Sequence, residues 1–368
     1  MKVLIAAGGS GGHIFPAIAL AHDLGKKRVA KNDILFIGSN RPLDVRIFEK
    51  EGFRFTLLSS NKLPYGFSFM LITFIVKLFA DMIRSFFAIL SFRPDVVVGF
   101  GGYVPCPVIL TAKIFGIPKI LHEQNAVAGR ANRLLFGLVD RIALSFQDTK
   151  NRLGRNANKA VLTGNPIRVD RLKNDKESGV RALGLDGAKF TVLVIGGSQG
   201  AHSINEKFIN AVTGMRKSVS DKLQVVHITG MKDYDEAVNS YREIGIDSRV
   251  FSFIDRIEDA YSVADLVITR SGSSAIFEIA FFGKPMILVP YPFAMNHQSE
   301  NARAFAEKGA AINIDEADLT AEKFKDTIEG LFNDKIRMVK LAESARMMSV
   351  PDASTRLADE VVSMGHGK

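Results

Sequence analysis

The sequence predicts an α/β protein of two similar domains, each built on a parallel sheet. A short apolar run, residues 3–7, leads into the glycine-rich segment GGSGGH (residues 8–13), and a second run, residues 191–195, leads into GGSQGAH (residues 196–202). The two segments begin 188 residues apart, about half of the 368-residue chain. Each opens a helical pattern, and helix N-termini present unpaired N–H groups and a positive dipole. Both segments are therefore expected to face a phosphate or pyrophosphate.

Strand and helix signals alternate through the first half of the chain. Apolar runs predict strands at residues 3–7, 34–37, 96–98, 117–121 and 141–144. The helix predicted from residue 12 has one apolar face, formed by Ile14, Ala17, Ile18, Ala21 and Leu24. Continuous apolar strands that alternate with helices are typical of a parallel sheet covered on both faces.

A turn-rich break, GNPIR at residues 164–168, is followed by a charged stretch and predicts a domain boundary. We expect an N-terminal domain of residues 1–163 and a C-terminal domain of residues 164–340. A final helical segment, residues 341–368, follows, and its return to the N-terminal domain is left open. Strands of the second half are predicted at residues 191–195, 223–228, 250–251, 266–269 and 286–289.

Composition favours an anionic partner. The net charge is +9 and the isoelectric point is near 9.5. The basic residues are scattered and no nucleic-acid-binding motif is present, so we expect no nucleic acid. The single cysteine, Cys106, excludes an internal disulfide and fits a reducing compartment. The apolar N-terminus is only five residues long and predicts a strand rather than a signal peptide.

The segment from residue 63 to 92 is unusually apolar. Its uncharged run, residues 63–76, has 14 residues, whereas a membrane-spanning helix needs about 20. Lys77, Asp81 and Arg84 fall at i, i+4 and i+7 and would form one polar stripe on an otherwise apolar helix. Two interpretations stay open. The helix belongs to the core, or it lies in a membrane interface, held by basic residues against anionic lipid.

Three polar motifs follow predicted strands, at the sheet edge where α/β proteins bind ligands. They are HEQN (residues 122–125), RSGSS (residues 270–274) and NHQ (residues 296–298). Small residues at the start of a helix leave N–H groups accessible to phosphate, and Glu278, a turn further on, could accept hydrogen bonds from ribose hydroxyls. The plain alternatives are a solvated loop for HEQN and a surface role for Glu278.

Other nucleotide sites fit less well. The glycine segments do not match G-x-G-x-x-G, because Ile14 occupies the third glycine position. No acid ends the second strand, although Arg41 there leaves a 2′-phosphate, and hence NADPH, open. No P-loop pattern occurs. Asp233 and Asp235 form a D-x-D pattern that could hold a divalent metal, but acids in a first helical turn also explain it. Because His/Cys metal spacing is absent, no metal is expected.

Seven motifs in order, from residue 4 to about 311, resemble those of the MurG family of bacterial glycosyltransferases. Besides HEQN, GNPIR, GGSQGAHSIN, RSGSSAIFEIA and the NHQ loop, they include GGSGGHIFPAIALA and GGYVPCPVILTAK. That family transfers N-acetylglucosamine (GlcNAc) from UDP-GlcNAc to undecaprenyl-pyrophosphoryl-MurNAc-pentapeptide (lipid I). The resemblance implies the GT-B fold: two Rossmann-like domains with parallel sheets that face each other across a cleft.

The resemblance also implies residue roles. Ile254 would meet the uracil through its backbone, Glu278 the ribose, and Ser198 with the start of the 273–278 helix the diphosphate. Gln298, beside His297, would contact the GlcNAc, and residues 10–13 would face the acceptor's pyrophosphate. The implied UDP-GlcNAc-binding residues are Ser10, Gly11, Gly12, Asn125, Arg168, Ser198, Ile254, Ser273, Ser274, Ala275, Ile276, Phe277, Glu278 and Gln298. Supporting residues are Arg270, His297, His122 and Tyr103.

Two positions differ from some members of that family. Ser10 stands where some carry Thr, and His297 stands where some carry Gln. Both replacements keep a hydrogen-bonding group, so the implied function is unchanged, but the detailed contacts to the GlcNAc are left open.

The implied reaction is an inverting displacement by the 4-hydroxyl of MurNAc, which yields lipid II. His13 is the first candidate for the general base, because imidazole titrates near neutral pH, and Glu123 is the second. Helix N-termini and Arg270 would stabilise the leaving UDP, with no cofactor. Implied partners are lipid I, the anionic inner-leaflet surface and other cell-wall synthesis proteins, at the cytoplasmic face of the membrane. Alternatives are an epimerase, another lipid glycosyltransferase, or a binding protein without turnover.

Overall fold

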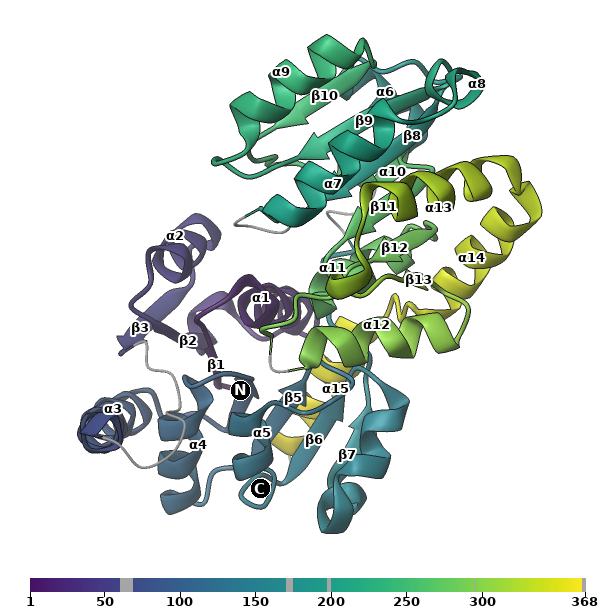
Figure 1. Ribbon diagram of the computed structural model, residues 1–368. Helices are drawn as coiled ribbons and strands as arrows, with labels where there is room; N and C mark the ends of the chain where they lie inside the picture. Colours follow the sequence, from purple (N-terminus) through teal and green to yellow (C-terminus); the bar gives the residue numbers. More distant parts are fainter. Residues whose placement is uncertain (60–68, 170–174, 197–199, 295, 366–368) are drawn as a thin grey trace. The chain divides into compact units, whose positions relative to one another are not determined.

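The computed structural model describes the whole chain except residues 60–68, 170–174, 197–199, 295 and 366–368, and it also leaves out the side chains of residues 69–71. The chain forms two compact domains (Figure 1). The first consists of residues 1–168 together with 350–368, and the second of residues 169–349.

The first domain is built on a parallel sheet with strand order β3-β2-β1-β4-β5-β6-β7. Between β1 and β4 the direction in which strands are added reverses. Loops at the carboxyl ends of these two strands therefore border the crevice where such sheets bind ligands. The strands are β1 (Val3–Ala7), β2 (Ile34–Ser39), β3 (Arg54–Leu58), β4 (Val96–Phe100), β5 (Lys119–Glu123), β6 (Arg141–Leu144) and β7 (Ala160–Leu162).

Helices cover both faces of this sheet because successive side chains of a strand point to opposite faces. Val3 and Ile5 pack with α1 (Gly11–Lys26), α2 (Pro42–Glu51) and α15 (Ala353–Gly365). Leu4 and Ala6 pack with α3 (Phe69–Phe92) and α4 (Pro105–Ile114). A third apolar cluster includes Leu121 of β5 and Leu135 of α5 (Arg130–Leu135). The described residues of this domain also form the short 3-10 helices η1 (Lys31–Asp33), η2 (Gln147–Arg152) and η3 (Gly154–Lys159).

The second domain repeats this plan, with parallel strand order β10-β9-β8-β11-β12-β13. The unit from β8 to α7 corresponds to the unit from β1 to α1, so the repeated glycine segment marks two equivalent positions. The strands are β8 (Phe190–Ile195), β9 (Leu223–Ile228), β10 (Ser248–Phe251), β11 (Leu266–Thr269), β12 (Met286–Leu288) and β13 (Ile312–Asn313). The helices are α6 (Lys176–Leu183), α7 (His202–Thr213), α8 (Lys217–Ser220), α9 (Tyr234–Ile244), α10 (Ile257–Val263), α11 (Ser273–Phe281), α12 (His297–Glu307), η4 (Glu316–Asp318), α13 (Ala321–Asn333) and α14 (Lys335–Met348).

The first domain boundary lies at residue 168 rather than at the expected 163. The GNPIR segment packs with the first domain: His122 Nε2 donates to the Gly164 carbonyl at 3.0 Å, and Ser354 Oγ donates to the Ile167 carbonyl at 3.1 Å.

The last segment, residues 341–368, is not a single helix. α14 ends at Met348 within the second domain, and α15 packs on the first. There Leu357, Ala358 and Val361 join the core, and Asp359 pairs with Lys27 at 2.6 Å.

Candidate functional site

The first glycine segment is held by a buried carboxylate that the sequence patterns did not indicate. Asp44 Oδ2 accepts hydrogen bonds from Gly9 N at 2.9 Å, Ser39 N at 3.0 Å and Ser39 Oγ at 2.6 Å. A Cβ at Gly8 would lie 2.5 Å from that oxygen, so only glycine fits. Arg41 donates to the Gly9 carbonyl. The arginine considered for a 2′-phosphate therefore helps to fix the loop instead.

Ser10, Gly11 and Gly12 form the start of α1 and place His13 at the carboxyl edge of the sheet. The ring nitrogen Nδ1 of His13 lies 3.2 Å from the Gly8 carbonyl and 3.1 Å from Ser10 Oγ. A carbonyl oxygen only accepts, so the neutral ring carries its proton on Nδ1 and its lone pair on Nε2. That tautomer is the one a general base needs at Nε2.

The loop after β4 closes against the His13 ring. Gly101 and Gly102 have positive φ values of 55° and 72°. A Cβ at Gly101 would lie 2.9 Å from His13 Nε2, and one at Gly102 would lie 3.1 Å from His13 Cε1. The two glycines therefore permit both the turn and the close approach of the imidazole.

Glu123, the second candidate base, organises its own loop. Its Oε1 accepts from Asn125 N at 3.0 Å and Asn125 Nδ2 at 3.1 Å, and its Oε2 accepts from Gly129 N at 3.0 Å and Asn132 Nδ2 at 2.7 Å. The side chain is 1% exposed. With two donors on each oxygen, this geometry favours a positioning role for Glu123 and leaves His13 as the better candidate for the base.

His122 and Arg168 are also anchored within the first domain. Burial lowers the pKa of His122 to about 4, so its ring is neutral while Nε2 donates to Gly164. Arg168 Nη1 donates to Glu51 Oε1 at 2.7 Å, and Glu51 also pairs with His22 at 3.0 Å. Arg168 and Asn125 thus lie in the first domain. The residues implied to bind UDP-GlcNAc that come after residue 168 lie in the second.

Tyr103 connects the β4 loop to α3. Its hydroxyl donates to Asp81 Oδ2 at 3.0 Å, and its ring packs edge-on against Phe74 with a centroid distance of 5.7 Å. Ser59 also donates to Asp81, through both its backbone and its side chain. The buried Asp81 therefore faces the domain, while Lys77 and Arg84 of the predicted polar stripe are exposed.

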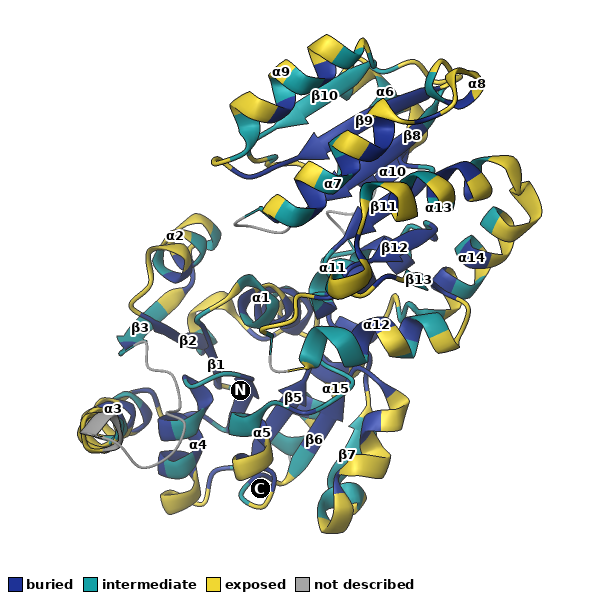
Figure 2. Ribbon diagram, viewed as in Figure 1, coloured by how far each residue is buried: buried dark blue, intermediate teal, exposed yellow. Residues whose placement is uncertain are grey.

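The opposite face of α3 is apolar and exposed, so α3 belongs to the core on one side only, through residues such as Ile89 and Phe92, and its role at a membrane interface stays a prediction. Figure 2 shows this helix as largely exposed. Among the described residues, no helix is long and apolar enough to cross a membrane. Six apolar side chains at helical spacing are between 48% and 62% exposed: Ile72, Val76, Phe79, Ile83, Phe87 and Leu90.

In the second domain, the helix α11 opens at the carboxyl end of β11, with Gly272 as N-cap and Ser273, Ser274 and Ala275 in its first turn. Ser274 Oγ is buried without a hydrogen-bond partner among the described residues. Ile276 and Phe277 are buried in the domain core, so a ligand could meet them only through their backbone. Ser198, predicted to join this site, lies outside the described residues.

Glu278 sits in the second turn of α11 with an altered acidity. Burial raises the pKa of its carboxyl to about 7, against the effect of the Tyr261 hydroxyl, which donates to Oε2 at 3.3 Å. A carboxylate that is costly to ionise in the free domain gains most from a ligand that offers it hydroxyl donors.

The remaining implied donor residues also follow strands. Ile254 is half-buried after β10, and His297 and Gln298 open α12 after β12. Gln298 Oε1 accepts from Tyr291 N at 2.9 Å, and the Gln298 carbonyl accepts from Ser271 Oγ at 2.7 Å. The position of Gln298 is thereby fixed at the carboxyl edge of the second sheet.

Arg270, expected to stabilise a leaving diphosphate, is bound by protein groups instead. Both Nη atoms donate to Glu316, Nη2 also donates to Ser203 Oγ at 3.1 Å, and Nη1 donates to the Val289 and Pro290 carbonyls at 3.2 and 3.3 Å. Burial would raise the pKa of Glu316, but the hydrogen bonds from Arg270 and Ser203 outweigh burial and hold it below its usual range. Arg270 therefore positions the loops around α7, β11 and β12.

The D-x-D pattern is accounted for by structure. Asp233 accepts from Asn205 Nδ2 at 2.7 Å and pairs with His202 at 3.1 Å, and Asp235 lies in the first turn of α9. Within the described part of the chain, no group of three or more His, Cys, Asp or Glu side chains is placed to hold a metal ion.

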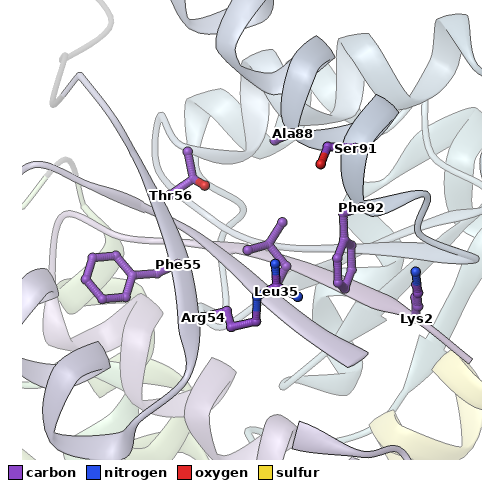
Figure 3. Close-up of a pocket in the computed structure, with 8 residues that line it drawn as sticks. All are labelled: Lys2, Leu35, Arg54, Phe55, Thr56, Ala88, Ser91 and Phe92. Atoms are coloured by element: carbon purple, nitrogen blue, oxygen red, sulfur yellow. The ribbon is translucent and has the colours of Figure 1, made fainter. Parts of the chain in front are cut away.

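A cavity of about 230 Å³ lies elsewhere, at the amino-terminal edge of the first sheet and beside the end of α3 (Figure 3). None of the predicted site residues lines it. Two cationic side chains do, and the Lys2 ammonium stacks on the Phe92 ring at 5.6 Å. The lining residues are Lys2, Leu35, Arg54, Phe55, Thr56, Ala88, Ser91 and Phe92.

Comparison with known proteins agrees with this architecture. Residues 3–144 match the glycosyltransferase family 28 N-terminal domain, and residues 191–357 match the family 28 C-terminal domain. A solved structure described as Acinetobacter baumannii MurG superposes with a TM-score of 0.77 at 25% identity, covering 98% of this chain and 99% of that one. A putative UDP-N-acetylglucosamine 2-epimerase from Listeria monocytogenes, at 15% identity and a TM-score of 0.74, shares the fold and covers 98% of this chain and 96% of its own.

The fold and the two matched domains define a family 28 glycosyltransferase of the GT-B class. Two curated relatives are UDP-N-acetylglucosamine–N-acetylmuramyl-(pentapeptide) pyrophosphoryl-undecaprenol N-acetylglucosamine transferases. The one from Halothermothrix orenii is 40% identical over 100% of both chains, and the one from Syntrophus aciditrophicus is 36% identical over 99% of both. This chain belongs to that family, the MurG family.

The geometry around Glu123 predicts a structural rather than a proton-transfer role. Glu123→Gln would replace one carboxylate oxygen by an NH₂ group that faces two N–H donors. This loss of hydrogen bonds should lower the free energy of unfolding by about 3 kcal/mol. We expect thermal unfolding at a lower temperature and a reduced kcat, with the acidic limb of the pH–rate profile retained. The exposed Glu49→Gln is the matched control. Loss of the acidic limb in a stably folded Glu123→Gln protein would instead make Glu123 the base.

Proposed function

We infer that this chain transfers GlcNAc from UDP-GlcNAc to the 4-hydroxyl of MurNAc in lipid I, with inversion, to give lipid II. The full-length match to transferases of this activity carries the inference. The geometry of each domain supports it, because both sheets present helix N-termini and polar side chains at their carboxyl edges.

UDP-GlcNAc binds to the second domain in this proposal. The N–H groups in the first turn of α11 receive the diphosphate, and Glu278 accepts hydrogen bonds from the ribose hydroxyls. Ile254 meets the uracil through its backbone, and Gln298 with His297 contacts the GlcNAc. The charge that develops on the leaving UDP is met by helix amides, so the proposal includes no resident metal or cofactor.

The first domain supplies the acceptor side. The lone pair on His13 Nε2 takes the proton of the MurNAc 4-hydroxyl as its oxygen attacks the anomeric carbon and UDP departs. Ser10, Gly11 and Gly12 face the acceptor's pyrophosphate with the N-terminus of α1. Glu123 and Tyr103 hold the loops around this base.

A transfer assay tests the reaction and the two key residues together. With labelled UDP-GlcNAc and a short-chain lipid I analogue, the wild type should form the lipid II analogue. His13→Ala should lower kcat by about 10²- to 10⁴-fold with UDP binding kept, as expected for loss of a general base. Glu278→Ala should mainly weaken donor binding. A folded wild type that binds UDP-GlcNAc but transfers nothing would contradict the proposal, and epimerised UDP-sugar would favour the epimerase alternative.

The raised pKa of Glu278 predicts pH-dependent donor binding. Only the ionised carboxylate accepts two ribose hydroxyls, so lowering the pH through about 7 should weaken UDP binding, by about tenfold between pH 8 and pH 6. Glu278→Gln should bind UDP more weakly and lose this pH-dependent component. It also serves as the control for titration of UDP itself, which affects both proteins equally. Calorimetric Kd values across this range check the prediction, and identical pH dependence in both proteins would refute it.

We also propose that α3 holds the protein on an anionic membrane at its cytoplasmic face, where lipid I would be presented. The exposed apolar stripe continues onto the end of α4, where Phe115 packs on Phe86 with a centroid distance of 5.1 Å and Ile114 is 71% exposed. Lys77 and Arg84 border the stripe, and Lys2 and Arg54 line the cavity beside α3. Apolar side chains flanked by cations suit the interface of an anionic membrane. The single cysteine fits a reducing compartment, which supports the cytoplasmic face.

Vesicle binding tests this surface. Wild type should sediment with vesicles that contain phosphatidylglycerol, less so with purely zwitterionic ones and less at high salt. Phe79→Ser/Phe87→Ser should lose at least tenfold in affinity, because each phenyl ring is worth about 1.5–3 kcal/mol when buried. The control is Ile336→Ser/Val339→Ser on α14, which removes exposed apolar side chains elsewhere. Equal loss in both variants would argue against α3.

A further inference from the structure

The carboxylate that is implied to bind the ribose has a single hydrogen-bond partner among the described side chains. The Tyr261 hydroxyl donates to Glu278 Oε2 at 3.3 Å, and no described residue donates to Oε1. Glu278 is half-buried, and Oε1 is not among the buried polar atoms that lack a partner. One oxygen of the carboxylate is therefore held by the protein, and the other is available to a ligand.

Tyr261 is itself fixed in the second domain. Its side chain is 2% exposed, and its ring packs against Phe282 at the end of α11 with a centroid distance of 5.6 Å. The helix that carries it, α10, is held at its other end by Lys284, which donates to the Ser262 carbonyl at 2.9 Å. This helix begins shortly after Ile254, the residue implied to meet the uracil. Tyr261 therefore connects the uracil segment to the ribose carboxylate through a side chain with little freedom to move.

The groups around Glu278 act on its acidity in opposite directions. Burial raises the pKa of its carboxyl to about 7, the hydrogen bond from Tyr261 lowers this pKa, and the charge of Glu258 raises it. Glu258 pairs with Arg256 at 3.7 Å, and α14, which also packs on α11, contributes Arg346 near the end of that helix. Burial raises the pKa of the Tyr261 hydroxyl well above its usual range, so this group stays protonated and able to donate.

We propose that Tyr261 is a positioning residue that sets the preference of the donor site for ribose. Its hydroxyl holds Oε2 of Glu278, so that Oε1 and the second lone pair of Oε2 are directed at the two adjacent ribose hydroxyls. At 3.3 Å the bond is long for a hydroxyl donor, and we expect it to shorten when the carboxyl loses its proton. This inference rests on the proposed function, in which Glu278 binds the ribose.

The decisive variant is Tyr261→Phe, which removes the hydroxyl and keeps the ring. Calorimetry with UDP and with 2′-deoxy-UDP, which lacks one of the two ribose hydroxyls, measures the preference of the site for ribose. The ratio of the two Kd values should be about tenfold in the wild type and about threefold or less in the variant. Tyr241→Phe is the matched control, because it removes another buried hydroxyl of the same domain, bonded to His227 at 2.8 Å.

The pH dependence of UDP binding is a readout that a packing role would not move. Without the hydroxyl the pKa of Glu278 should rise, so UDP binding should weaken at pH 7 and recover at higher pH. Replacing Tyr261 by 3-fluorotyrosine keeps the ring and makes the hydroxyl a stronger donor, so it should move the dependence to lower pH. This replacement tests the proposal even if Tyr261→Phe does not fold.

A double-mutant cycle shows whether Tyr261 acts through the carboxylate. In a Glu278→Ala background, Tyr261→Phe should change UDP affinity by less than about twofold. An equal loss of affinity in both backgrounds, or an unchanged Kd ratio and pH dependence in Tyr261→Phe, would overturn the proposal. A wild type that does not bind UDP, or binds 2′-deoxy-UDP equally well, would contradict the donor site of the proposed function. A wild type that prefers UDP beside an unchanged Tyr261→Phe would refute this inference alone.

Discussion

The close approach of the His13 ring to the backbone of Gly101 and Gly102 is the constraint on which the carboxyl edge of the first sheet depends. The ring is fixed from the other side by the Gly8 carbonyl, and Gly8 itself has no room for a side chain beside Asp44. The β1 loop, the β4 loop and the imidazole therefore form one packed unit. A displacement of any of them moves the lone pair on Nε2, which explains why so many glycines are needed there.

Buried and half-buried charges in both domains serve geometry more than chemistry. Glu123 shapes the loop after β5, Asp44 holds the first glycine segment, and the Arg270–Glu316 pair joins the loops around α7, β11 and β12. Each group accepts or donates several hydrogen bonds with fixed partners, so these loops need little reorganisation during the reaction. Preorganisation of this kind lets fixed protein groups stabilise charge that develops during a reaction.

The interior of each sheet could be predicted from the sequence, and its edges could not. Val3–Ala7 and Leu266–Thr269 are buried along their whole length and stand out as largely apolar runs, whereas β3 begins with the exposed Arg54 and β13 has only two residues. The polar motifs did locate the carboxyl ends of the strands, where the candidate site lies. The roles of Glu123 and Arg270 depended on partners brought together by folding, such as Glu316, 46 residues from Arg270. Periodicity likewise showed a polar stripe on α3, but not that Asp81 faces inward.

α3 keeps the carboxylate of Asp81 inside the domain and the phenyl rings of Phe79 and Phe87 outside, so without a bilayer its apolar face is in contact with water. An uncovered apolar stripe promotes self-association in water. The net charge of +9 opposes this by mutual repulsion between molecules, and salt weakens that repulsion. The same positive charges thus support both solubility and attachment to an anionic membrane. High ionic strength, which releases the protein from lipid, therefore also weakens the repulsion between protein molecules.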